Sequence, residues 1–142
     1  MPVLDLAALQ KQFHLAPFIA DLGMALEAVA AGECTTTLAL APRHLQQNGV
    51  VHAGVLATMA DHTAGAAAWT LAAAGAAVMT AEIKVSFLRA AVGERLICRA
   101  RVIKPGRQVC FVEAEVFCLH AGAEQLAAKA SATMIVLAPP SP

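Results

Sequence analysis

The feature that most constrains the fold is a long run without a charged side chain, from Ala64 to Ala81. A run of this length raises the question of a membrane-spanning helix. Its members are mostly Ala, Gly and Thr, however, which are only weakly apolar, and Asp61 lies on the turn before it. Gly75 is typical of a helix end. We therefore expect a helix that is apolar on every side and buried at the centre of the fold, with no membrane as a partner.

Strand patterns lie before and after this helix, which we expect over residues 54–74. After the helix the hydrophobic period changes from 3.6 to 2. Strands are expected over residues 24–29, 34–40, 79–87, 94–103, 109–118 and 126–137. Tight turns such as Lys104–Arg107 join the later strands, and short connections imply antiparallel pairing. The sequence therefore predicts an α+β fold in which an antiparallel sheet wraps around one long central helix.

Alternation assigns the side chains of the later strands to two faces. In the first strand after the helix, one apolar face holds Met79, Ala81, Ile83, Val85 and Phe87. The opposite face holds Thr80, Glu82, Lys84 and Ser86. In the following strands the same period places Cys98, Cys110 and Cys118 inside, so no cysteine nucleophile is expected.

Length and composition suit a single domain over residues 1–142, with a helical segment in residues 1–20, capped by Asp5, and a frayed tail over 138–142. Ten basic and ten acidic side chains cancel, and no basic run is present, so nucleic acid is not expected as a partner. The four cysteines form no C-x-x-C pair, and we expect no metal and no cofactor. The absence of a secretory leader predicts a cytoplasmic protein.

The chain is 58% hydrophobic and only 14% charged. For a small domain this is a surplus of apolar surface. We therefore expect that another subunit covers part of the surface.

The segment Gln46–Thr63 carries the chemistry, because a polar loop here runs into the start of the central helix. The first amides of a helix have no partner within it and lie at the positive end of its dipole. The amides near Ala53, Gly54 and Val55 can therefore polarise a carbonyl group or hold an oxyanion. The small residues at this point let a substrate approach the backbone closely.

Asp61 lies about two turns into the same helix, among Ala, Thr, Met and Gly residues. A buried carboxylate without a partner is costly in free energy. Asp61 is therefore either paired, for example at a subunit contact, or placed there for function. The residue types alone leave both alternatives open.

The segment Asn48–Asp61, with the sequence NGVVHAGVLATMAD, resembles the signature of the PaaI-like hotdog acyl-CoA thioesterases of the phenylacetate-degradation type. Thr80–Arg89 resembles the next strand of that family, and Lys104–Arg107 its later hairpin. The resemblance covers about residues 20–137. It implies the hotdog fold and hydrolysis of an acyl-CoA to a free acid and coenzyme A, and it leaves open whether the acyl group is aryl, short or medium in length.

The resemblance also implies a role for each matching position. Asp61 would activate water as a general base or attack directly, and the amide of Ala53 would polarise the thioester carbonyl. Gln46 would contact the carbonyl or the water, His52 would organise the loop, and Thr80 would help to place the water. Contacts to coenzyme A or substrate are implied for Asn48, Gly54, Phe87, Leu88, Arg89, Lys104, Gly106 and Arg107.

Three positions depart from the family pattern. Ala53 replaces a Gly, Gln46 replaces an Asn, and Ala90 replaces a Pro. Ala53 keeps its amide, so the oxyanion donor survives if the backbone angle there suits Ala.

Assembly is a further implication of the resemblance, since the family forms dimers, often paired into tetramers, with each site built from two subunits. A homodimer or homotetramer is thus expected, with Asp61 of one protomer facing Ala53 of another. Two other functions fit the same fold. One is a non-catalytic acyl-CoA sensor, against which the presence of Asp61 counts. The other is an acyl-thioester hydratase, whose pattern the segment His52–Asp61 matches poorly.

Overall fold

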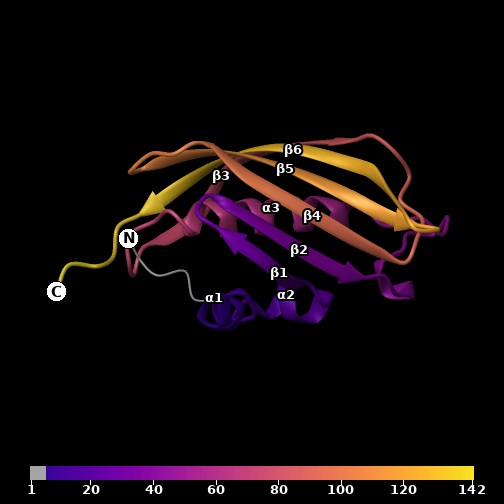
Figure 1. The fold of residues 1–142 in the computed structure, drawn as a ribbon, viewed down its shortest axis with the longest axis horizontal. Helices are drawn as coiled ribbons and strands as arrows, with labels where there is room; N and C mark the ends of the chain where they lie inside the picture. Colours follow the sequence, from indigo (N-terminus) through magenta and orange to yellow (C-terminus); the bar gives the residue numbers. More distant parts are fainter. Residues whose placement is uncertain (1–5) are drawn as a thin grey trace.

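A six-stranded antiparallel sheet forms most of the computed structural model, which describes residues 6–142. The strand order is β1-β2-β4-β5-β6-β3 (Figure 1). The strands are β1 (Ala25–Ala30), β2 (Glu33–Ala39), β3 (Ala77–Phe87), β4 (Arg95–Lys104), β5 (Val109–His120) and β6 (Ala123–Leu137). All neighbouring pairs run antiparallel, as the tight turns predict. β3 lies at one edge of the sheet and β1 at the other.

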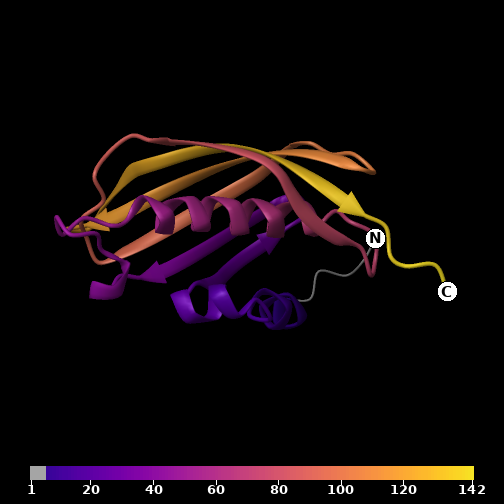
Figure 2. The same cartoon turned by 180° about the vertical axis from the view of Figure 1, so that it is seen from behind.

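The central helix α3 (Ala53–Trp69) lies in the concave side of this sheet, which curves over it (Figure 2). Its buried face, which includes Met59, Ala64 and Ala67, packs against the inner faces of β2 to β6. Small side chains let helix and sheet approach closely, and the inner positions of β4 and β5 are buried as the alternation predicts. The expected α+β hotdog architecture is thus confirmed.

The helix ends at Trp69 and not at residue 74, as the sequence pattern suggested. Thr70 explains the earlier end, because its hydroxyl group donates to Ala67 O at 2.7 Å and accepts from Gly32 N at 2.8 Å. The backbone then turns through Gly75, whose φ of 81° lies in the left-handed region that glycine tolerates best.

A β-bulge in β3 overturns the expected alternation of this strand. The pairing of β3 with β6 shifts between Thr80 and Glu82, so Ala81 is the extra residue. Beyond the bulge, Ile83 and Val85 pack on the core as expected. Before it the phase is reversed, because Val78 packs on the core while Met79 is 60% exposed. Met79 and Ala81 therefore do not share the inner face.

Two short helices, α1 (Leu6–Phe13) and α2 (Pro17–Leu22), lie against the β1 side of the molecule, beside α3 rather than over the convex face of the sheet (Figure 2). Leu9 and Phe13 of α1 are buried, and the His14 ring bonds Met24 O through Nε2 at 3.0 Å. The cap expected at Asp5 falls outside the described residues. Between residues 6 and 142, none of the helices is long and apolar enough to cross a membrane.

Candidate active site

His52 caps the start of α3 and determines which of its first amides is free. The His52 side chain accepts from Gly54 N through Nδ1 at 2.8 Å, and His52 O accepts from Val55 N at 2.9 Å. Because Nδ1 accepts, the proton of the neutral ring is on Nε2. Within residues 6–142, the amide of Ala53 has no acceptor. Of the three amides that the sequence indicated, those of Gly54 and Val55 donate to His52, and the amide of Ala53 remains as the free donor.

Ala53 suits this position although the family has a Gly here. It is the first residue of α3, and the only non-glycine residue in the described chain with a positive φ is Ala121. Ala53 therefore keeps an ordinary helical backbone, and its exposed amide points away from the helix body.

Gln46, which lines the same pocket as Ala53, supplies a second donor. Its side-chain oxygen Oε1 accepts from Asn48 N. The NH2 group of the same side chain takes no part in this bond and can donate to a ligand. The loop is held at both ends by backbone bonds, from Gln46 N to Val50 O at 2.8 Å and from Gly49 N to Gln46 O at 3.0 Å. The backbone amides of Asn48 and Gly54 are thus both used within the chain, by Gln46 and His52.

His44, which the sequence analysis missed, holds this loop in place through hydrogen bonds of its ring and its backbone. The ring is fully buried, accepts from Ala41 N at 3.0 Å and bonds Leu22 O through Nε2 at 2.8 Å. The backbone carbonyl oxygen of His44 accepts from His52 N at 2.9 Å. His44 therefore ties α2 to the residue that caps α3. No motif or residue spacing in this polar loop predicts such a role for His44.

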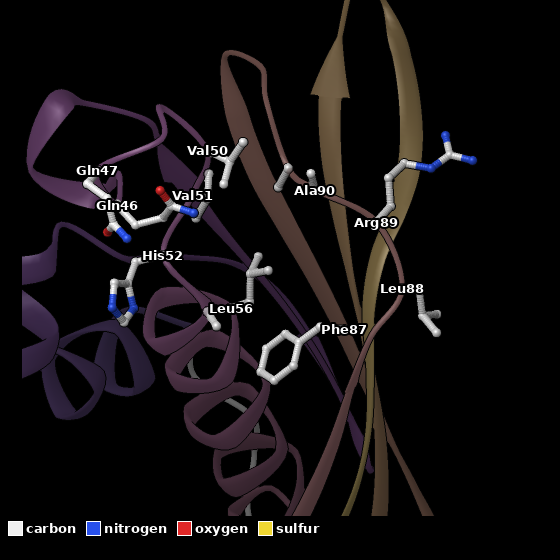
Figure 3. A pocket seen from close by; sticks show the side chains of 12 residues that line it. Gln46, Gln47, Val50, Val51, His52, Leu56, Phe87, Leu88, Arg89 and Ala90 are labelled. Carbon is white, nitrogen blue, oxygen red and sulfur yellow. The ribbon is translucent and has the colours of Figure 1, made fainter.

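These donors lie around a first pocket of about 510 Å³. Its walls are the loop, the first turn of α3 and the segment after β3, with lining residues Gln46, Gln47, Val50, Val51, His52, Ala53, Leu56, Phe87, Leu88, Arg89, Ala90 and Ala91. The Phe87 ring points toward Leu56, whereas the Arg89 side chain extends away from α3 (Figure 3). Among residues 6–142, no carboxylate lines this pocket.

Asp61 lies elsewhere, in a second pocket of about 640 Å³ between α1, α3 and β3. Its Oδ1 accepts from the Thr80 hydroxyl group at 2.6 Å. Thr80 reaches it because the bulge turns this residue toward α3, whereas unbroken alternation would place it on the outer face with Glu82. Across the described chain, Asp61 has no basic partner within salt-bridge distance. The alternative of an ion-paired structural Asp61 therefore finds no support within one chain.

The two groups cannot act together within a single chain. Ala53 and Asp61 are about 12 Å apart along α3, at 1.5 Å per residue. A general base must lie within about 3 Å of the proton that it takes, or one water further. The carbonyl-polarising amide and the carboxylate are therefore two separated halves of a site.

The remaining candidate residues for binding coenzyme A lie near opposite ends of α3. Gly106 and Arg107 line a third pocket of about 330 Å³ near the end of α3, with Leu71 and Val136. Lys104 lies on the same hairpin and donates to Pro105 O at 3.5 Å. Within one chain these residues do not join Phe87, Leu88 and Arg89, which line the first pocket.

His62 is a further titratable group beside Asp61, and burial lowers its pKa from the usual 6.5, with the nearby Asp61 opposing the shift. Its ring meets that of Phe13 edge to face, with centroids 4.4 Å apart. The lowered pKa favours a neutral imidazole at neutral pH.

The model of the thioesterase superfamily matches residues 48–123 of this chain. A thioesterase family protein from Silicibacter pomeroyi is 35% identical, with 91% of this chain and 95% of that chain covered and a TM-score of 0.88. A phenylacetic acid degradation-related protein from Ralstonia eutropha is 28% identical over 89% of this chain and 98% of that chain, with a TM-score of 0.77.

At lower identity, a thioesterase from Haemophilus influenzae shares the fold, with 21% identity, 95% of this chain and 92% of that chain covered, and a TM-score of 0.84. The comparison with curated proteins gave no significant match. The match spans more than half of the chain and includes the loop from Asn48 onward, α3 and the bulged strand. The chain thus belongs to the thioesterase superfamily and is a hotdog-fold hydrolase of thioesters.

Proposed function

We propose that this protein hydrolyses acyl-CoA esters at sites built from two copies of the chain. The observation that carries the proposal is the division of the site. Free donors gather at Ala53 and Gln46 in a pocket without a carboxylate, while Asp61 lies about 12 Å away along α3 with Thr80. A second copy that brings its Asp61 to the first copy's Ala53 would complete both sites.

The edge strand β3 supports such a pairing. It is 11 residues long, exposes most of its residues and, in the part of the chain that the structure describes, has no strand paired on its outer side. A long uncovered edge invites pairing with another strand, whereas the opposite edge, β1, is short and contacts α1. An isologous pair formed by β3 and its symmetry mate would continue the sheet across two copies.

Charges along β3 favour one register of this pair. In an antiparallel pair, residues directly opposite each other have side chains on the same face of the sheet. The two-fold axis of a pair of identical strands must therefore lie level with one residue, which is then opposite its own copy, and not level with the bond between two residues. An axis at Glu82 or at Lys84 would place like charges opposite each other. An axis at Ile83 places Glu82 of each copy opposite Lys84 of the other, so we favour this register.

Within such a site the residues divide the reaction between them. Asp61 takes a proton from water, and the oxygen of that water attacks the thioester carbon. The amide of Ala53, with the Gln46 NH2 group beside it, stabilises the negative charge on the carbonyl oxygen. The tetrahedral intermediate then expels the thiolate of coenzyme A, which takes up the proton, and the free acid is left. Direct attack by Asp61, with hydrolysis of the resulting anhydride, uses the same groups.

Coenzyme A would bind through exposed cations that the two copies together bring to the site. Arg89 lies at the first pocket, and Lys104 and Arg107 lie on the hairpin between β4 and β5. Guanidinium and ammonium groups suit the phosphates of the nucleotide end.

Release of free thiol from a panel of acyl-CoA esters tests this function. We expect hydrolysis of at least one ester, with the free acid and coenzyme A formed in equal amounts. Tight binding of the esters without turnover would instead support the sensor, and addition of water to an enoyl-CoA without thiol release would support the hydratase.

Exchanging the charges of β3 tests the proposed register. Glu82→Lys places Lys opposite Lys in both pairs of the dimer, so we expect weaker association and lower activity at low protein concentration. The double variant Glu82→Lys with Lys84→Glu restores opposite charges and should recover both. Analytical ultracentrifugation measures the dimer, and equal dimerisation by all three proteins would contradict this register.

A further inference from the structure

The second pocket extends away from Asp61 along one face of α3. Asp61, Gly65 and Trp69 lie on this face at the spacing of successive helical turns, and all three line the pocket. Its polar lining residues are Gln12, Asp61, His62 and Thr80, and the remaining walls, from α1, β1, β3 and the turn before β3, are mainly apolar. A substrate carbonyl held beside Asp61 would therefore have an apolar channel leading from it along the helix.

Gly65 keeps the middle of this channel open. A Cβ atom built at Gly65 would have no atom of another part of the protein within 4 Å, so the space directly over this residue is open. Gly costs about 1 kcal/mol relative to Ala inside a helix, and no packing contact requires it here. The missing side chain leaves room for something that lies along α3.

The channel has a defined far end and a defined side wall. At the far end the Trp69 ring is held by a hydrogen bond from Nε1 to Ala76 O at 3.3 Å. Phe13 of α1 forms the side wall, being 5% exposed and packed edge to face on His62. Figure 2 shows α1 on the open side of the molecule, where no strand covers α3.

The length of the channel indicates the size of its occupant. Asp61 and Trp69 are about 12 Å apart along α3. An extended chain advances about 1.2 Å per bond, by the measure of the extended backbone, so this span matches about eight to ten carbons.

We propose that this channel holds the acyl chain, that the preferred substrates carry linear medium-chain acyl groups of about eight to ten carbons, and that Gly65 and Phe13 set the accepted length. This inference rests on the proposed hydrolysis of acyl-CoA. A short acyl group would leave the channel unfilled, and a long one would meet Trp69 or have to displace Phe13.

The test is the kcat/KM of aryl-CoA esters and of linear acyl-CoA esters from two to sixteen carbons, with wild type, Gly65→Val and Phe13→Ala. We expect a wild-type maximum near eight to ten carbons. Gly65→Val should lower the ratio of decanoyl to butyryl turnover by about tenfold or more, because branched carbons fill the channel. Phe13→Ala should raise the ratio of myristoyl to decanoyl turnover, because it opens the side wall.

Two control variants separate the channel from effects on folding. Gly65→Ala adds only a methyl group and should raise the thermal midpoint while shifting the profile less than Val does. Phe18→Ala removes the same ring from α2, where it is 64% exposed and lines none of the three pockets, and should keep the wild-type profile.

Each outcome bears on a distinct claim. If no ester is hydrolysed, the proposed function itself fails. If esters are hydrolysed but the maximum lies at aryl or two-carbon groups, or the profile ignores both Gly65→Val and Phe13→Ala, the channel does not hold the acyl chain.

Discussion

Asp61→Asn is expected to lower kcat for the best acyl-CoA ester by about a hundredfold to ten thousandfold, the range of general acid–base catalysis. The amide has nearly the shape of the carboxylate, and its oxygen can still accept from the Thr80 hydroxyl group. It cannot take a proton from water, however, or attack as an anion. Thiol release measured at saturating ester, with dimerisation and coenzyme A binding measured in parallel, isolates the chemical step.

Asp21→Asn is the matched control for this variant. Asp21 is exposed on α2 and lines none of the three pockets, so the same chemical change there should leave kcat at the wild-type value. Turnover by Asp61→Asn equal to that of Asp21→Asn would remove Asp61 from its assigned role and leave the oxyanion donors to account for the reaction.

The local parts of this molecule are those that its sequence predicted best. The start of α3 follows from a polar loop that leads into small residues, and the buried faces of β4 and β5 follow from strict alternation. Each of these signals lies within a few residues of the structure that it specifies. The early end of α3 could not be predicted from nearby residues, because the Thr70 hydroxyl group accepts from Gly32 N, which is far away in the chain.

The bulge in β3 shows why periodicity alone misplaced Thr80. One extra residue, Ala81, reverses the phase of everything before it, and nothing in the composition of β3 marks the insertion. The family resemblance assigned Thr80 to the site, although alternation placed it on the outer face. The 2.6 Å bond from the Thr80 hydroxyl group brings Thr80 to Asp61, and this contact depends on the register of β3 on β6, which is a tertiary property.

The second pocket was equally difficult to predict from the sequence. Its walls come from α1, the middle of α3 and the start of β3, which are brought together only by folding. Gly65 read as one small residue among many in an Ala-rich helix, and the space above it is known only from the packing around it. Phe13 lay in the helical segment expected within residues 1–20, and no pattern in the sequence indicated its contact with α3.

Ala53→Pro is expected to lower kcat about a hundredfold to a thousandfold, the cost of removing one oxyanion donor. Proline has no N–H, and the first position of a helix is where a helix tolerates it best. His52 already has the extended backbone, φ −61° and ψ 135°, that a residue before proline adopts. The variant therefore deletes one hydrogen-bond donor and should keep the fold, whereas Ala53→Gly, which keeps the N–H, should retain activity within a few-fold.

Mixing the two inactive proteins then tests whether each site takes groups from two copies. In a dimer of one Asp61→Asn chain and one Ala53→Pro chain, the intact Asp61 of the second chain meets the intact amide of the first. One site is whole and the other lacks both groups. Random exchange of equal amounts should thus restore about a quarter of wild-type activity, since half of the dimers are mixed and each has one working site. If subunits exchange and activity stays at the level of the parents, Asp61 and Ala53 do not act across the interface. Recovery, by contrast, would require that both groups act on one substrate, since no chain in the mixture holds an intact pair.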